Sequence, residues 1–313
     1  MSILPVYLWS YPAHLRYGTN AGEPLRVLGN LLKNVQASLA AWRSNGHVDT
    51  TKAFEAIVAV PEYTFVEQRM VIERDAMTSQ DKDLLVAGLR NLSKQYPKVL
   101  IFAGSIFWRE AIDTDEALAR YHANLIAAEL NLVKFSKTPP TDRATHLRLH
   151  GMQNTSGTRT PALQDLVSTK AAPVTCRAYN TVYAFLNGQL AFAPYNKECD
   201  FFETGGRSPM EIAYVPGSSG GIREVGGFTF GIEVCRDHYV NTLDGKQADF
   251  HIVLSCAVQV KPSQNIGKYL IHASSKADWT GVWDGRNPVT PGKAPAEDDI
   301  GLWFLEPPNP IGV

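Results

Sequence analysis

The 313-residue sequence lacks long uninterrupted apolar runs. None of its apolar stretches approaches the roughly 20 residues that a membrane-spanning helix needs, and its first residues show no basic leader before an apolar segment. Neither sign of charge is in excess, since the formal net charge is −1 at pH 7. So balanced a charge gives little electrostatic basis for general binding to nucleic acid or to an anionic membrane surface. These absences predict a soluble protein with no nucleic acid and no membrane among its partners.

Cysteine is scarce as well. The chain has four cysteines, far apart and without a CxxC pair: Cys176, Cys199, Cys235 and Cys256. In a chain this long, such spacing is typical neither of a disulfide scaffold nor of a zinc site. His146 and His150 are four residues apart, but no obvious third ligand accompanies them. We therefore expect free thiols, no metal and a cytoplasmic location, and we interpret every cysteine except Cys235 as structural.

The N-terminal part of the chain alternates between strand and helix patterns. Apolar residues recur at helical spacing from Pro24 to Arg43, which predicts an amphipathic helix. A second helix is predicted to start with Ser79 as its N-cap and to run to about Gln95. The predicted strands are Val6 to Ser10, Ala56 to Val60 and Lys98 to Phe107. This order is typical of an α/β fold in which helices cover a sheet.

The alternation of strand and helix breaks between about Arg109 and Arg177. A stretch that long without clear elements is uncommon inside a compact domain and usually has a functional reason. We interpret it as an irregular insertion within a single domain covering 1–313, and we expect it to border the pocket and influence substrate choice. Regular patterns return with a strand at Tyr179 to Leu186, the turn Asn187-Gly188 and a strand at Gln189 to Ala193, which together predict a β-hairpin.

Three residues with catalytic chemistry each follow a β-type run. Glu62 follows an apolar run and a proline, Lys197 follows the predicted hairpin, and Cys235 follows Phe228 to Val234. Reacting groups in open α/β sheets lie at the carboxyl ends of strands. A carboxylate, an amine and a thiol in such positions can serve as base, electrostatic stabiliser and nucleophile. The pattern therefore predicts a cysteine-based active site.

These motifs resemble the nitrilase superfamily of carbon–nitrogen hydrolases, whose catalytic order is Glu, Lys, Cys. The matching features are Pro61-Glu62, Asn180-Thr181 with the Asn187-Gly188 hairpin that leads to Tyr195-Asn196-Lys197, and the stretch from Gly231 to Asp237 with its Cys-x-Asp box at Cys235. The resemblance covers about residues 1–107 and 178–256. It implies an α/β layered fold, an α-β-β-α sandwich of two packed mixed sheets with outer helices. It also implies a homodimer or larger assembly, by analogy.

The resemblance further implies a reaction and roles for the three residues. The expected reaction is hydrolysis of a non-peptide C–N bond, in an amide, a carbamoyl compound or a nitrile, through an acyl-enzyme and without a cofactor. Glu62 would take the proton from Cys235, and Lys197 would stabilise the oxyanion. Lys137 also follows a β-type run and is the alternative lysine; Lys197 is preferred because the hairpin precedes it and because it lies closer to Cys235 in sequence.

Other residues are candidates for orienting the substrate or forming the oxyanion site. A second glutamate that the family often carries is matched best by Glu203, with Glu198 as the alternative. Arg236 and His238, beside the nucleophile, are further candidates. An acyltransferase with the same triad, or a catalytically silent interaction module with the same fold, are the alternative functions.

The sequence departs from the family pattern in three places. The interval between Glu62 and Lys197 is longer than usual, because the irregular segment lies within it. Arg236 stands where relatives often carry an aromatic residue, and beyond Ala257 the family's usual long helical segment is hard to find. These departures leave the substrate subfamily open.

Overall fold

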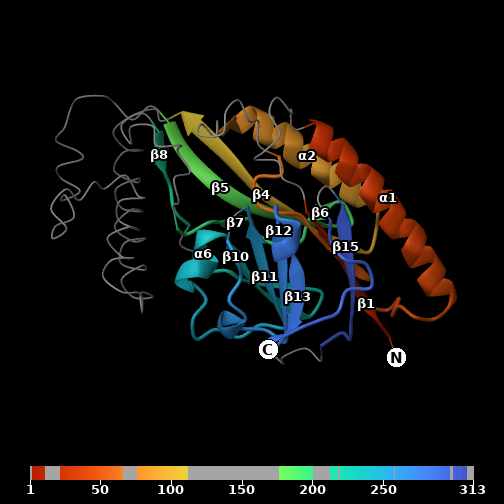
Figure 1. The fold of residues 1–313 in the computed structure, drawn as a ribbon. Helices are drawn as coiled ribbons and strands as arrows, with labels where there is room; N and C mark the ends of the chain where they lie inside the picture. Colours follow the sequence, from red (N-terminus) through yellow and green to blue (C-terminus); the bar gives the residue numbers. More distant parts are fainter. Residues whose placement is uncertain are drawn as a thin grey trace, which may run out of the picture.

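Two β-sheets lie face to face, and two long helices cover the outer face of the first sheet (Figure 1). The computed structural model describes residues 2–10, 22–65, 76–111, 176–199, 212–217, 219–256, 258–296 and 299–308. The first sheet has the strand order β15-β1-β2-β4-β5-β6, with β3, β7 and β8 attached to β4 or β5. The second sheet has the order β14-β13-β12-β11-β10-β9. Both sheets mix parallel and antiparallel pairs.

The elements have the following bounds. The first sheet contains β1 (Leu4–Trp9), β2 (Ala56–Ala59), β3 (Met77–Thr78), β4 (Val99–Ala111), β5 (Cys176–Leu186), β6 (Gln189–Leu190), β7 (Tyr195–Asn196), β8 (Ile212–Tyr214) and β15 (Ile300–Leu305). The second sheet contains β9 (Ile222–Val225), β10 (Phe228–Val234), β11 (Phe250–Ser255), β12 (Tyr269–Ser274), β13 (Gly281–Asp284) and β14 (Asn287–Pro288). The helices are α1 (Gly22–Ser44), α2 (Ser79–Gln95) and the short α6 (Arg236–Val240), with 3₁₀ turns η2 (Pro262–Gln264) and η3 (Ala277–Trp279).

The first sheet is buried on both faces. In β2, Ile57 and Ala59 belong to the core between the sheets, while Val58 belongs to the core under the helices. Because both faces are covered, the strand is a continuous apolar run rather than an alternating one. Leu28 and Leu32 of α1 contribute to the helix side of this core, at the spacing of one helical face.

The predicted α/β layered sandwich of two packed mixed sheets is confirmed, and so are α1, α2 and the hairpin. Asn187 and Gly188 both have positive φ, 52° and 77°, as the two-residue hairpin turn requires. One prediction was wrong in detail: the N-cap of α2 is Thr78, whose side chain accepts a hydrogen bond from the Asp81 N–H at 3.1 Å, and Ser79 is already helical. Within the described residues, no helix is long and apolar enough to cross a membrane.

The second sheet differs from the expectation of outer helices on both sides. In the described part of the chain, its outer face carries α6, η2 and irregular segments but no long helix (Figure 1). Residues 258–268 pass from β11 to β12 through η2, where the family pattern has its long helical segment. The predicted insertion at about 109–177 lies mostly outside the described residues, so its place beside the pocket stays a prediction.

Candidate active site

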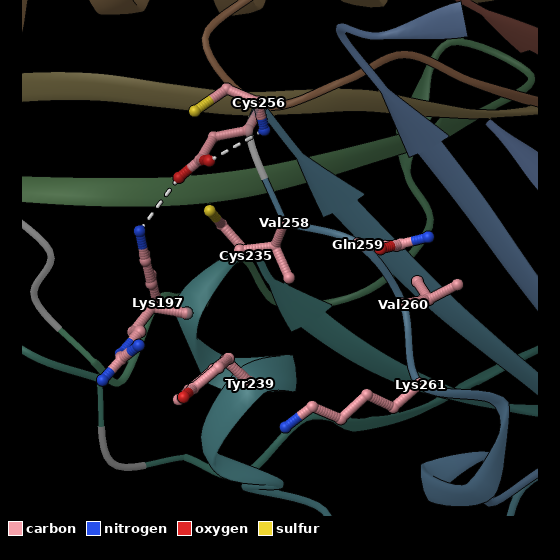
Figure 2. A pocket seen from close by; sticks show the side chains of 10 residues that line it. Lys197, Cys235, Tyr239, Cys256, Val258, Gln259, Val260 and Lys261 are labelled. Carbon is pink, nitrogen blue, oxygen red and sulfur yellow. Dashed lines mark hydrogen bonds and ion pairs between the residues drawn. The ribbon is translucent and has the colours of Figure 1, made fainter. Parts of the chain in front are cut away.

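Cys235 lies at a sharp turn between β10 and α6. Its φ of 50° and ψ of −99° are unusual for a residue with a side chain, and it occupies the N-cap position of α6. Such a strained conformation costs on the order of 1–3 kcal/mol and is found mostly at functional sites. The turn directs the thiol into a cavity between the ends of the two sheets, as Figure 2 shows.

Glu62 and Lys197 form a buried ion pair beside this thiol. The Lys197 Nζ lies 3.0 Å from the Glu62 Oε1, and each side chain is at most 1% exposed. Two further donors hold the same carboxylate. The Asn180 Nδ2 donates to Oε1 at 3.0 Å, and the Cys256 N–H donates to Oε2 at 3.2 Å. The carboxylate of Glu62 is thus fixed by three donors from three segments far apart in sequence.

The three predicted catalytic residues line one cavity of about 440 Å³. Its lining residues are Glu62, Lys197, Cys235, Arg236, Tyr239, Cys256, Val258, Gln259, Val260 and Lys261. Figure 2 shows Lys197, Cys235 and Cys256 converging on the same space. The structure therefore brings Glu62, Lys197 and Cys235 together, with Arg236 at the same cavity.

The charges of the site favour a cationic lysine and a neutral thiol in the resting state. Burial by itself would lower the pKa of Lys197, but the negative charge of Glu62, helped by that of Asp237, raises it above its usual value. The pKa of Cys235 is raised well above its usual value by a hydrogen bond with the Cys256 side chain, by burial and by the charge of Glu62. The thiol therefore needs a base when a substrate arrives.

Asp237 of the Cys-x-Asp box holds the lysine segment against the nucleophile turn. Its carboxylate accepts hydrogen bonds from the Tyr195 hydroxyl at 2.8 Å and from the Cys199 and Glu198 N–H groups at 2.7 and 3.2 Å. Burial is the main cause that raises the pKa of Asp237 to about 6. The side chain of Asp237 thus positions Lys197 relative to Cys235 without itself lining the cavity.

The prediction for His238 needs correction. Among the described residues, His238 is fully buried behind the turn and does not line the cavity. Its Nδ1 lies 2.6 Å from the Glu233 Oε2, and its Nε2 accepts a hydrogen bond from the Lys261 N–H at 3.0 Å. The sequence places His238 close to the nucleophile, but α6 turns its ring to the outer side of the sheet.

The other candidates that the sequence offered are the second glutamate, the alternative lysine and the histidine pair, and the structure describes only one of these residues. Glu198 is buried beside Asp237 and does not line the cavity, and burial is the main cause that raises its pKa to about 8. Glu203 and Lys137 lie outside the described residues, as do His146 and His150. The structure therefore leaves the second glutamate untested.

Two site residues were missed by sequence reasoning. Asn180 lies on β5 and donates to Glu62; Asn180-Thr181 is among the features that resemble the family, but the sequence assigned Asn180 no role. Cys256 was interpreted as structural, but it lines the cavity next to Cys235. The available signal was that Cys256, like Cys235, directly follows a buried β-type run.

Two buried groups in the described residues have donor atoms close enough to hold a metal ion: Glu62 with Cys235 and Cys256, and Glu233 with His238 and His251. In the first group, the Glu62 carboxylate already accepts from Lys197, Asn180 and Cys256, and a cation would meet the ammonium of Lys197. In the second, the outer ring nitrogens accept backbone N–H groups of Lys261 and Ile266, so the inner nitrogens carry protons that bond Glu233. Neither group fits a metal in this arrangement.

Comparison with known proteins relates this arrangement to solved structures. No family model matches the sequence, and a search of curated proteins found no match. Nit3 from Saccharomyces cerevisiae, described as a member of branch 10 of the nitrilase superfamily, is 14% identical at a TM-score of 0.51. The alignment covers 98% of this chain and 91% of Nit3.

Two further solved structures are similar. XC1258 from Xanthomonas campestris, a CN-hydrolase superfamily protein with an arsenic adduct in its active site, is 11% identical at a TM-score of 0.52, over 98% of this chain and 91% of that one. A mutant amidase from Nesterenkonia sp. AN1 in complex with acrylamide is 10% identical at a TM-score of 0.50. The alignment covers 97% of this chain and 90% of the amidase. At these identities the similarity establishes the fold alone. The chain has the fold of the nitrilase superfamily, as its motifs predict.

Proposed function

We propose that the protein hydrolyses a non-peptide C–N bond, in an amide, a carbamoyl compound or a nitrile, through a thioester-type acyl-enzyme on Cys235. The observation that carries this proposal is the buried Glu62–Lys197 pair, 3.0 Å apart, on the same cavity as the strained Cys235. Burying two opposite charges costs several kcal/mol per ion before they attract each other. An arrangement that costly, beside a thiol, suits catalysis better than structural support.

In the proposed reaction, Glu62 takes the proton of the Cys235 thiol as the sulfur attacks the substrate carbon. The negative charge that develops on the substrate oxygen or nitrogen is stabilised by the Lys197 ammonium and by the backbone N–H of Arg236 at the start of α6. Removing one such donor typically costs ~2.7–4 kcal/mol of transition-state stabilisation.

For an amide or a carbamoyl compound, the C–N bond then breaks. The leaving nitrogen takes the proton from Glu62, and a thioester remains on Cys235. Glu62 next removes a proton from a water molecule, which attacks the thioester and releases the acid and the free thiol. The raised pKa of the resting thiol agrees with this order, because the proton moves only when a substrate is bound.

The direct test is ammonia release from a panel of small amides, carbamoyl compounds and nitriles. We expect wild-type protein to release ammonia from at least one of them, and Cys235→Ala to release none, because the nucleophile is absent. Cys199→Ala is the matched control. Cys199 is also a buried free cysteine but does not line the cavity, so this variant should keep the activity.

Other outcomes would assign the alternative functions. Turnover that appears only when an amine acceptor is added, and that still needs Cys235, would indicate an acyltransferase. Release of ammonia by folded Cys235→Ala at the wild-type rate would contradict the mechanism. No turnover and no thiol adduct with any compound would favour the silent module. The cytoplasmic location, the assembly as a homodimer or larger, and the absence of a cofactor stay predictions.

A further inference from the structure

Two thiols share the candidate active site. Cys235 directly follows β10 and Cys256 directly follows β11, and these strands are parallel neighbours in the second sheet. The Sγ atoms and the nearest Glu62 oxygen all lie within 4.8 Å of one another. Both cysteines are buried, at 3% and 4% exposure, and both line the cavity. The cavity that a substrate would use therefore reaches both thiols.

The backbone places these two residues at a separation that a disulfide can bridge. Val234 is in register with Leu254, and the Cys235 N–H donates to the Leu254 carbonyl at 2.9 Å. Cys256 thus lies one residue beyond the position directly opposite Cys235. If the strand spacing of about 4.8 Å and the rise of about 3.3 Å per residue continued to these positions, the two Cα atoms would lie roughly 6 Å apart. Disulfides join Cα atoms about 4.4–6.8 Å apart, so rotation of the side chains can bring the sulfurs together.

We propose that Cys256 is a resolving thiol, and that this cavity is a site of reversible oxidation where a hydroperoxide converts Cys235 and Cys256 into a disulfide. The proposal rests on the reactivity of Cys235 in the proposed function. It assigns to Cys256 a chemical role that the hydrolysis itself does not need.

The oxidation takes place in two balanced steps. The Cys235 sulfur, after passing its proton to Glu62, attacks one oxygen of the hydroperoxide. The O–O bond breaks, the leaving alkoxide or hydroxide takes the proton from Glu62 and departs as alcohol or water, and Cys235 becomes a sulfenic acid. The Cys256 thiol then attacks the Cys235 sulfur, the S–O bond breaks, and water leaves as the disulfide forms. A small dithiol reverses the change by thiol–disulfide exchange.

The geometry favours Cys256 over Cys199. Cys199 is also buried, but it does not line the cavity, and its side chain hydrogen-bonds to Asp237 behind the lysine segment. The Cys256 side chain, in contrast, already shares a hydrogen bond with the Cys235 side chain. A sulfenic acid on Cys235 would therefore meet the Cys256 thiol before the Cys199 thiol.

The test is to treat the native protein with hydrogen peroxide, block the remaining thiols under denaturing conditions, and measure intact mass and a peptide map. We expect a species that carries two blocking groups instead of four and is lighter by about 2 Da once those groups are subtracted, and a linked peptide pair containing Cys235 and Cys256. Dithiothreitol should return the original mass. Cys199→Ser is the matched control and should form the same linked pair.

Two outcomes would overturn the proposal. One is wild-type protein that gains about 16 or 32 Da on Cys235 and never loses 2 Da. The other is Cys256→Ser, folded by circular dichroism, that still forms a disulfide at Cys235. The expected result for Cys256→Ser is instead irreversible gain of oxygen on Cys235. Since mass needs no turnover, a disulfide in a protein that hydrolyses nothing would sink the proposed function and leave this inference standing.

Discussion

At the scale of the residue, Lys197 is held on both sides of its backbone. Its N–H donates to the Asn180 carbonyl at 2.8 Å, and its carbonyl accepts from the Gly217 N–H at 3.0 Å. Gly217 permits this approach because a Cβ there would lie only 2.0 Å from the Asn196 carbonyl oxygen. The ammonium therefore reaches Glu62 from a fixed backbone, as a preorganised electrostatic group requires.

This placement predicts different effects for two lysines. Lys197→Ala should lower kcat and kcat/KM together, by about 10²–10³-fold, because it removes a charge that acts on the transition state. Lys137→Ala should change both little. The measurement is steady-state kinetics on whichever compound releases ammonia, with folding checked by circular dichroism. The reverse result, a loss of activity only in Lys137→Ala, would mean that the wrong lysine has been assigned.

Sequence reasoning placed Glu62, Lys197 and Cys235 correctly at strand ends, and the structure gathers them at one cavity. It could not place His238 or Cys256. The direction of the His238 ring depends on the turn at Cys235, and the closeness of Cys256 depends on the register of two strands. Neither is visible in a local pattern.

At the scale of the element, the segment 195–199 and the nucleophile turn are joined through buried acidic groups. Asp237 accepts hydrogen bonds from three donors of that segment, and it lies close enough to Glu198 for its charge to raise the pKa of that carboxyl. Burial and the charge of Asp237 raise the pKa of Glu198 to about 8. In the folded protein Glu198 is therefore neutral at pH 7, while in the unfolded chain it is ionised.

This difference predicts how stability depends on pH. Between about pH 4.5 and 8 the folded state binds one more proton at Glu198 than the unfolded state, so the free energy of unfolding falls as pH rises, by up to about 1 kcal/mol per pH unit. Glu198→Gln removes this contribution and should flatten the dependence, which urea unfolding at several pH values measures. Glu224→Gln, at an exposed glutamate of β9, should keep the wild-type slope. Equal slopes in all three proteins would contradict the burial of a neutral Glu198.

The elements that sequence patterns predicted were those with regular apolar periodicity, such as α1 and β10. The strand β12 was missed because buried polar residues interrupt its apolar pattern. His272 and Ser274 lie on it, and the Ser255 hydroxyl lies 2.7 Å from the His272 Nε2. A buried contact between strands gives the His272 Nε2 a hydrogen-bond partner, but a single sequence does not show that the partner is near.

At the scale of the whole molecule, the sandwich brings together strand ends that are far apart in sequence. Glu62 follows β2 of the first sheet and Cys235 follows β10 of the second, and Cys256 N–H bonds Glu62 across the interface of the two sheets. Behind the nucleophile turn, Glu233 accepts from His238, His251, Thr242 and Leu243. In the described residues, this polar network stands on the outer face where the family pattern has its long helix.

The layered fold could be predicted because each predicted helix or strand has an apolar face that must pack against another layer. The hydrogen-bond network of Glu233 on the outer face of the second sheet could not be predicted. Glu233, His238 and His251 lie within 18 residues of one another, but their spacing does not mark a known site. Their role depends on β10 and β11 lying parallel, with Gly231 in register with His251.

The central claim is that Cys235 forms a covalent acyl-enzyme, and intact mass spectrometry after acid quenching during turnover tests it most directly. The account predicts a mass increase equal to the acyl part of the substrate after loss of its nitrogen group, on the peptide that contains Cys235. Cys235→Ala should show no adduct, and Cys199→Ala should show the same adduct as wild type. An acyl group on Cys256 or Cys199 instead, or sustained ammonia release with Cys235 never modified, would contradict the account.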